Sequence, residues 1–153
     1  MQKDNCIFCR IAQNKLPSVK VLEDSEHLAI LDLNPNTEGV TIVITKDHFD
    51  SDATDMPDKS YTALMLFAKQ TCKILEKGLK VKRVAIVMEG LGINHVHIKL
   101  YPIHGLKEKF VEIWAEGREY FDEYKGYLST KLGPEASIEK RLETLKKIES
   151  NLK

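Results

Sequence analysis

The sequence has no long apolar run. None of its apolar stretches approaches the roughly 20 residues that a membrane-spanning helix needs. The first residues, Met1 to Cys6, also lack the apolar core of a secretion signal. We therefore expect a cytoplasmic protein with no membrane partner.

The sequence also lacks an excess of charge of either sign. Its 23 Lys and Arg residues balance 23 Asp and Glu residues, which gives a net charge of +0 at pH 7. No overall field draws such a chain onto nucleic acid, so we expect no nucleic-acid partner, and an anionic substrate has to be held by local groups. At 153 residues the chain suits one domain that buries enough surface to fold without a metal or a disulfide.

Cysteine is scarce as well. Three cysteines in a reducing compartment cannot form a disulfide framework. The spacing of Cys6 and Cys9 is that of half a metal site or a redox pair, and spacing alone leaves metal binding, redox use and coincidence open. Two cysteines with two histidines form a closed zinc site of the structural kind, and His48 is a candidate third ligand. We interpret Cys72 as a packed thiol.

The apolar periodicity is typical of an antiparallel α+β domain, because strands are followed by a helix and then by more strands. The predicted strands are residues 19–23, 28–33, 41–45, 83–89 and 95–101. The predicted helices are a short one around residues 7–11, a long one at 60–77 capped by Gly78, and a last one that starts at Ser137. Residues 110–115 are a further candidate strand, and residues 120–131 show no clear period.

One predicted strand carries an unusual set of polar residues. Side chains alternate between the faces of a strand, so His95, His97 and Lys99 share one face. These groups are costly to bury unpaired, which indicates that this face meets solvent, a ligand or a metal. A solvated strand face is an equally good interpretation of the strand alone. Gly90 and Gly92, just before the strand, favour a ligand, because glycine lets backbone N–H groups approach an anion.

Three other polar residues have simpler interpretations. Asp32 ends an apolar strand just before Asn34 and Pro35, where it can act as a turn-forming residue. His27 and His104 have no partner that spacing identifies. We therefore interpret both as surface or turn histidines.

Four short segments occur in the order and spacing of the histidine-triad (HIT) family. These segments are residues 6–11, 31–35, 42–48 and 95–100. The similarity covers residues 5–102, and the chain resembles the zinc-bearing branch of the family most. The fold that this resemblance implies is α+β, with a five-stranded antiparallel sheet and one long helix, usually paired as a homodimer.

The resemblance also implies a division of the chain. Residues 1–105 would form the HIT domain. Residues 106–153 would then be a C-terminal helical extension, packed on the same domain or on a dimer partner.

The activity implied by the resemblance is that of a nucleotide hydrolase or nucleotidyltransferase. The middle histidine of the motif, His97, would attack the α-phosphorus of a nucleotide conjugate and form a covalent nucleotidyl-histidine. The conjugate would be a dinucleoside polyphosphate, a nucleoside phosphoramidate or a nucleotide sugar. A neutral imidazole suits this role, because it is a competent nucleophile at pH 7 whose other nitrogen a backbone carbonyl can orient.

The zinc-bearing relatives imply the remaining roles. A structural zinc ion would be bound by Cys6, Cys9, His48 and His95. The nucleotide would be bound by Ile7, Phe8, Ile11, Asp32, Leu33, Gly92 and Asn94. Within this set Asp32 would hold the ribose hydroxyls, and the loop residues Gly92 and Asn94 would replace the Gln-Ser or Gln-Thr of relatives.

The sequence departs from the family at the third motif position, where Lys99 replaces histidine. In relatives this imidazole contacts phosphate and helps to handle the proton of the leaving group. A lysine keeps its proton at pH 7 and adds mainly charge, so we expect Lys99 to stabilise the phosphates electrostatically. The alternative function is that of a catalytically weak or inactive nucleotide-binding or regulatory HIT-like protein.

Overall fold

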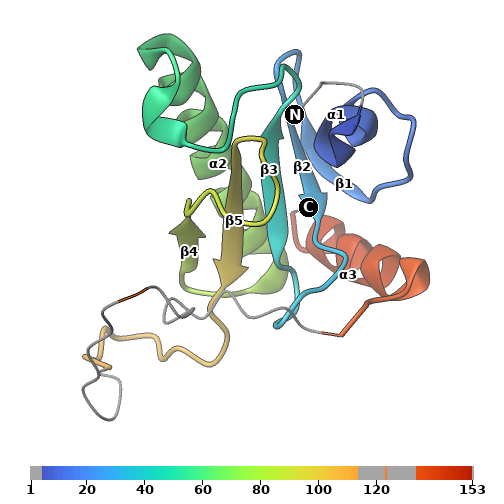
Figure 1. The fold of residues 1–153 in the computed structure, drawn as a ribbon. Coiled ribbons are helices and arrows are strands. Elements are labelled where there is room, and N and C mark those ends of the chain that lie inside the picture. The colour runs from blue at the N-terminus through green and yellow to red at the C-terminus, as the bar shows by residue number, and fades with distance from the viewer. Residues whose placement is uncertain (1–4, 114–122, 124–133, 153) are drawn as a thin grey trace.

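The fold is built on one antiparallel sheet. The computed structural model describes residues 5–113, 123 and 134–152 (Figure 1). The strands are β1 (Lys20–Glu23), β2 (His27–Leu31), β3 (Thr41–Thr45), β4 (Val84–Val87) and β5 (His97–Pro102). They pair in the order β1-β2-β3-β5-β4, and each neighbouring pair is antiparallel. The predicted α+β class with a five-stranded antiparallel sheet is confirmed.

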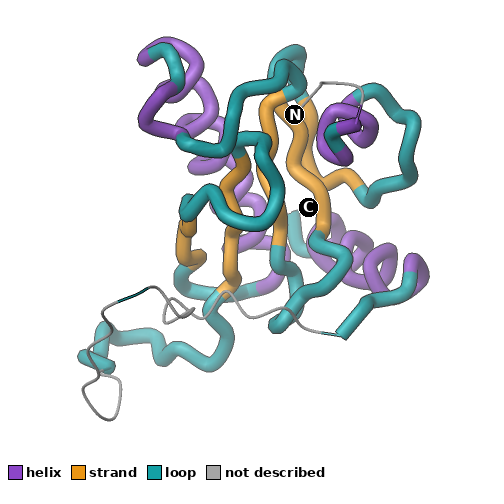
Figure 2. The backbone as a smooth tube through the Cα atoms, in the orientation of Figure 1, coloured by secondary structure: helices purple, strands orange, loops and turns teal. Residues whose placement is uncertain are grey.

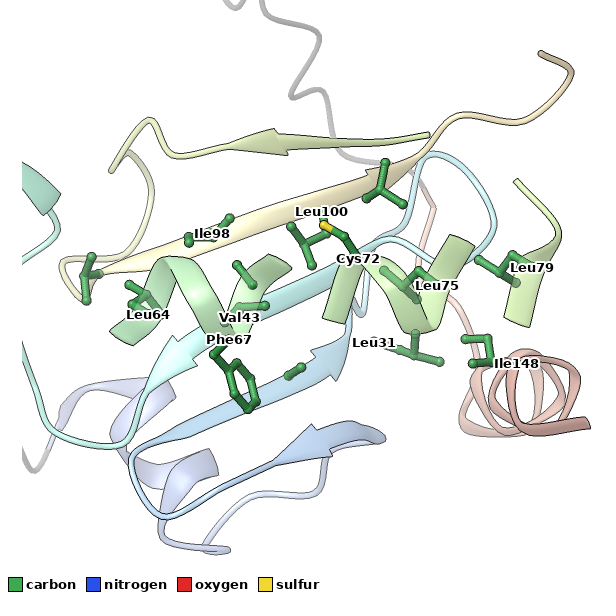
Figure 3. Close-up of a cluster of buried hydrophobic side chains, with 14 of the residues drawn as sticks. Leu31, Val43, Leu64, Phe67, Cys72, Leu75, Leu79, Ile98, Leu100 and Ile148 are labelled. Carbon is green, nitrogen blue, oxygen red and sulfur yellow. The ribbon is translucent and has the colours of Figure 1, made fainter. Parts of the chain in front are cut away.

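The long helix α2 (Asp58–Leu79) covers one face of this sheet. Its apolar side packs on alternate residues of the central strands, among them Val43, Ile98 and Leu100 (Figure 3). Burying such side chains contributes about 1.5–3 kcal/mol each to the free energy of unfolding. The predicted packed thiol, Cys72, is buried in this cluster, and burial raises the pKa of its thiol to about 11.

The short helix α1 (Ile7–Ala12) covers the opposite face. Phe8 of α1 packs with Cys6, Cys9 and the strand residues that point away from α2. Those strand residues are Leu28, Ile30, Ile42 and Ile44. In β5, Ile98 and Leu100 point to α2. Because side chains alternate along a strand, His97 and Lys99 point to the α1 side. The polar face of β5 therefore lies on the same side of the sheet as α1. Figure 2 shows how the helices and strands are arranged.

A third helix, α3 (Ile138–Ser150), packs against α2. Its predicted start is confirmed, because Ser137 is the N-cap and its side chain accepts a hydrogen bond from the backbone N–H of Lys140. The prediction that Gly78 caps α2 is wrong. Gly78 lies inside the helix, and Lys80 takes the left-handed cap conformation. A Cβ atom on Gly78 would lie 2.6 Å from Cα of Ile148, so glycine is needed here for close helix packing. The division of the chain at residue 105 stays a prediction.

We expect Gly78→Ala to lower the free energy of unfolding by about 1–3 kcal/mol, because the added methyl group forces α3 away from α2. Thermal denaturation followed by circular dichroism measures this loss. The matched control is Gln70→Ala on the exposed side of α2, which should change stability by less than about 0.5 kcal/mol. An unchanged midpoint for Gly78→Ala would contradict the packing of α3 on α2.

Other boundaries differ from the sequence-based ones by a few residues. The strand predicted at residues 28–33 ends at Leu31, so Asp32 follows the strand, and His95 precedes β5. The prediction of a strand at residues 110–115 is wrong for residues 110–113, because they form no regular element. Residues 114 and 115 lie outside the described part of the chain. The region 120–131 is also outside it, apart from residue 123. No helix within the described ranges is long and apolar enough to cross a membrane.

The interpretation of His27 as a surface or turn residue is wrong. The side chain is buried at the start of β2, and its Nδ1 atom lies 3.1 Å from a carboxylate oxygen of Asp24. Its ring stacks on Phe67 at 5.1 Å between centroids. Burial is tolerated because the ring has both a polar and an apolar partner. His104 is exposed, as predicted, and contacts the carbonyl oxygen of Glu38.

Candidate functional site

A cluster of four metal-binding side chains joins three distant parts of the chain. Cys6 and Cys9 lie one helical turn apart at the start of α1, His48 follows β3, and His95 precedes β5. Their ligand atoms all lie within 4.8 Å of one another. Sγ of Cys6 is 3.3 Å from Nδ1 of His95, and Nδ1 of His48 is 3.2 Å from the same nitrogen. The four predicted ligands therefore form one potential metal-binding cluster.

The spacing and chemistry of this cluster fit a tetrahedral zinc site. Typical Zn–N and Zn–S bonds separate neighbouring ligand atoms by about 3.3–3.8 Å. Nδ1 of His95 lies at 3.2–3.5 Å from the ligand atoms of the other three residues, which is close to that range. Nε2–H of His95 donates a hydrogen bond to the carbonyl oxygen of Thr45 at 2.9 Å, which leaves the Nδ1 lone pair for a metal. Burial lowers the pKa of His95 to about 4, so the imidazole is in its neutral, ligating form at pH 7.

His97 is held in one tautomer beside this cluster. Its Nδ1–H donates a hydrogen bond to the carbonyl oxygen of His95 at 2.8 Å, so Nε2 carries the lone pair. The ring is buried, and Phe8 packs on it at 5.3 Å between centroids. Burial lowers the pKa of His97, which keeps the imidazole neutral. An oriented neutral imidazole with a free nitrogen is a competent nucleophile.

His97 lines a pocket of about 690 Å³ between α1, the sheet and α3. Most of the predicted nucleotide-binding residues line the same pocket. They are Ile7, Phe8, Ile11, Asp32, Leu33 and Gly92, together with the predicted catalytic residues His97 and Lys99. The pocket is large enough for a small ligand and combines apolar walls with a few polar groups, as ligand sites usually do.

Asn94 is the predicted nucleotide-binding residue that does not line the pocket. Its side-chain amide donates a hydrogen bond to Asp50 at 2.9 Å and accepts one from the backbone N–H of Ser51, also at 2.9 Å. These bonds tie the loop before β5 to the segment that follows His48. A nucleotide contact by Asn94 stays a prediction.

Asp32 and Lys99 form a buried ion pair within the pocket. Nζ of Lys99 lies 3.3 Å from Oδ2 of Asp32, and both side chains are mostly buried. The other oxygen, Oδ1, accepts a hydrogen bond from the backbone N–H of Asn34, so the predicted turn role of Asp32 is confirmed. Apart from this ion pair, Oδ2 has no hydrogen bond among the described residues, so it is able to accept one from a ligand hydroxyl.

Sequence reasoning missed several pocket residues. Besides the predicted residues, the lining contains Leu16, Pro17, Ser18, Ile30, Leu31, Asn34, Ile42, Glu89, Leu91, Ile93 and Arg141. Arg141 comes from α3, far from the other residues in the sequence. One signal could have identified it: Arg141 has the same helical spacing as Leu145, Ile148 and Leu152, so it is a charged residue on the apolar side of its helix.

The fold and the site together define an α+β domain of the HIT type, with a potential metal cluster and a buried histidine on β5. The HIT domain family matches residues 13–104, which is more than half of the chain. This protein therefore belongs to the HIT family.

Known proteins agree with this assignment. The chain is 33% identical over 126 residues to the protein hit of Bacillus subtilis, covering 80% of this chain and 85% of that one. It is 30% identical over 122 residues to the adenosine 5'-monophosphoramidase HNT1 of Saccharomyces cerevisiae, covering 76% and 74%. A zinc-bound HIT family protein from Mycobacterium smegmatis shares the fold, with a TM-score of 0.69 and 24% identity over 99% of this chain and 95% of that one.

Proposed function

We propose that this protein is a nucleotide-binding hydrolase or nucleotidyltransferase that acts on the α-phosphate of a nucleotide conjugate. The observation that carries the proposal is the orientation of His97, whose Nδ1–H is fixed by a backbone carbonyl and whose ring lines the pocket. A HIT family relative with 30% identity is named an adenosine 5'-monophosphoramidase, which supports a phosphorus-directed reaction.

In the proposed reaction, Nε2 of His97 attacks the α-phosphorus and forms a P–N bond. The bond from phosphorus to the leaving group breaks, and the leaving group departs with the electron pair and takes up a proton. Water or another acceptor then attacks the same phosphorus and restores His97. Lys99 stabilises the negative charge on the phosphate oxygens electrostatically, Asp32 accepts hydrogen bonds from the ribose hydroxyls, and the apolar residues from α1 pack on the base.

We also propose that the metal cluster holds a structural zinc ion. Two thiolates and two neutral imidazoles suit zinc, and a zinc-bound HIT protein shares this fold. The ion would tie α1 to the start of β5 and so fix the backbone carbonyl that orients His97.

The experiment that tests the reaction is mass spectrometry of the intact protein after brief incubation with substrates. The panel contains a dinucleoside polyphosphate, a nucleoside phosphoramidate and a nucleotide sugar. We expect a mass increase of one nucleotidyl group, which is a nucleoside monophosphate less one water, together with release of the free monophosphate. If no member of the panel yields either product, the proposed function is wrong.

The replacement of the third histidine by Lys99 favours a second candidate function, that of a nucleotide-binding protein with weak or no catalysis. The ion pair with Asp32 ties up part of the charge of Lys99. This candidate is supported if the wild-type protein binds nucleoside monophosphates but turns over no conjugate, while Lys99→His turns conjugates over.

If the protein is an enzyme, we expect Lys99→Met to lower turnover by about 100-fold, because it removes a cation that stabilises charge in the transition state. Steady-state kinetics on the best conjugate of the panel measures the effect. Lys73→Met, at an exposed lysine of α2, is the matched control and should leave turnover unchanged. Equal turnover of Lys99→Met and the wild type would exclude a catalytic role for Lys99.

Two further expectations remain proposals. A cytoplasmic location is one, and pairing as a homodimer is the other. β4 is a free edge of the sheet within the described part of the chain, with Ile86 exposed, and such an edge can pair with another chain. Light scattering on the purified protein measures the oligomeric state.

A further inference from the structure

The helix α3 brings a positive charge to the pocket from outside the region that matches the HIT family. The family match ends at residue 104, whereas Arg141 lies in α3 and lines the pocket with Asp32 and His97. In the view of Figure 1, α3 (red) lies below α1 (dark blue), and its residue Ile148 packs in the same cluster as α2. The pocket therefore has one wall that the family region alone does not provide.

Several contacts fix α3 and so hold Arg141 in place. Ile148 is fully buried against Gly78, and the side-chain amide of Asn151 donates a hydrogen bond to the carbonyl oxygen of Gly78 at 2.6 Å. Lys147 forms an ion pair with Glu38 at 2.8 Å. A helix held at several points along its length presents its side chains in a defined geometry.

The side chain of Arg141 is partly buried in the pocket wall, and one of its donors has no partner among the described residues. Its Nε atom is buried and has no hydrogen-bond partner, and Arg141 forms no ion pair with any residue in the described ranges. Lys99, the other cation in the pocket, is paired with Asp32. A buried N–H without a partner costs free energy, so a ligand that supplied an acceptor to this guanidinium would be favoured.

The position of Arg141 indicates which part of the ligand it meets. The backbone N–H of Ala136, next to the start of α3, donates a hydrogen bond to the carbonyl oxygen of Leu33 at 2.9 Å. His97 lies at the level of Leu28 across the sheet, since both flank Ile44. From Leu28 to Leu33, just past the end of β2, the rise of a strand gives a distance on the order of 15 Å. Arg141 therefore lies toward the end of the pocket remote from His97.

We propose that Arg141 is a specificity-determining residue that donates hydrogen bonds to acceptor atoms on the base or ribose of the bound nucleotide. This inference rests on the proposed function, because His97 meets the phosphorus and the nucleoside then extends toward Leu33. A guanidinium only donates hydrogen bonds and can bind two acceptors at once, so it favours a ligand edge with two neighbouring acceptors. The N7 and O6 atoms of guanine form such an edge, and ribose oxygens form another.

The test measures the affinity of the wild type, Arg141→Met and Arg141→Lys for five probes by calorimetry. The probes are adenosine, guanosine, AMP, GMP and inorganic phosphate. Lys146→Met is the matched control, because it removes an exposed cation from the same helix outside the pocket. Arg141→Lys fills the same space and keeps the charge, so it provides the result if Arg141→Met does not fold. Thermal denaturation of each variant checks folding.

We expect Arg141→Met to lower the affinity for each nucleoside and for its monophosphate by the same factor, about 10- to 100-fold. This factor corresponds to the loss of a hydrogen bond to a charged group. Arg141→Lys should lose less affinity than Arg141→Met, and Lys146→Met should bind the probes as tightly as the wild type. A larger loss for guanosine than for adenosine assigns the contact to the base. If the two losses are equal, 2',3'-dideoxyadenosine serves as a sixth probe, and a loss that disappears with it assigns the contact to the ribose.

Three outcomes would overturn the proposal. Unchanged affinities in both Arg141 variants would show that Arg141 contacts no ligand. A loss confined to AMP, GMP and phosphate would show that it contacts the phosphate instead. If the wild type binds no nucleoside or monophosphate at all, the proposed function fails together with this inference. If the wild type binds them and the Arg141 variants bind equally well, only this inference fails.

Discussion

His97→Ala should abolish the nucleotidyl adduct and lower turnover of the best conjugate by about 10⁴-fold or more. Removing a covalent nucleophile costs this much, because only binding and electrostatic stabilisation then remain. The expectation follows from the geometry of the site: Nδ1–H is held at 2.8 Å from the carbonyl oxygen of His95, and the ring lines the pocket. Intact-mass spectrometry and steady-state kinetics on the same preparations measure both effects.

The matched control for this substitution is His104→Ala. His104 is exposed and contacts the carbonyl oxygen of Glu38, outside the pocket lining. It should leave both the adduct and the turnover unchanged. An adduct of undiminished yield in folded His97→Ala protein would assign the nucleophile to another residue.

The second large effect is expected from the metal cluster. The wild-type protein should contain about one zinc ion per chain, and Cys9→Ser should contain almost none, because a tetrahedral site that loses a thiolate binds zinc far more weakly. Cys9 is buried, and its Sγ atom lies 3.4 Å from Nδ1 of His48 and 3.5 Å from Nδ1 of His95. Loss of the ion should lower the midpoint of thermal unfolding by about 10 °C, since it leaves α1 and the start of β5 unconnected.

Zinc is measured by elemental analysis of the purified protein, and stability by circular dichroism. Cys72→Ala is the matched control: this thiol belongs to α2 and is buried in the apolar cluster on the α2 side of the sheet, away from the metal cluster, so its removal should leave the zinc content at about one per chain. Stoichiometric zinc that is lost in Cys9→Ser also excludes a redox role for the Cys6 and Cys9 pair. A wild-type protein purified without zinc, and unable to take it up, would refute a structural zinc site.

Zinc content and adduct formation distinguish the effects of Cys9→Ser and His97→Ala. Cys9→Ser should remove the proposed zinc ion from the segment around His95, so it should weaken the orientation of His97 as well as stability. His97→Ala should remove the adduct while zinc content stays at the wild-type level, because His97 is not among the four clustered residues.

Much of the fold was predictable from the sequence because the pattern and the structure share one cause. β3 spans Thr41–Thr45, as its β-branched run predicted, and these five residues are buried. The alternation of β5 was also predictable: Ile98 and Leu100 pack on α2, and His97 and Lys99 face the pocket. Where the prediction failed, local sequence carried no signal for the partner. His27 reads as an isolated polar residue, because neither Asp24 nor Phe67 marks itself as the group that makes its burial possible.

The role of Gly78 shows the same limit. A glycine near the end of a helical pattern usually caps the helix, but here the deciding contact is with Ile148, 70 positions further along the chain. Lys80 then ends the helix in the left-handed conformation that glycine was expected to adopt. Local propensity was overridden by the close packing of two helices.

The sequence by itself determined which chemical groups this protein has for the proposed reaction: a histidine as the proposed nucleophile, a lysine in place of the third histidine, and two cysteines with two histidines as potential metal ligands. Residue type and spacing carry that information, because chemistry depends on functional groups and a strand or helical turn fixes their relative sides. The tertiary structure alone decided their distances, the ion pair of Asp32 with Lys99, and the entry of Arg141 into the pocket. These features depend on packing between segments far apart in the chain, and no local pattern records such contacts.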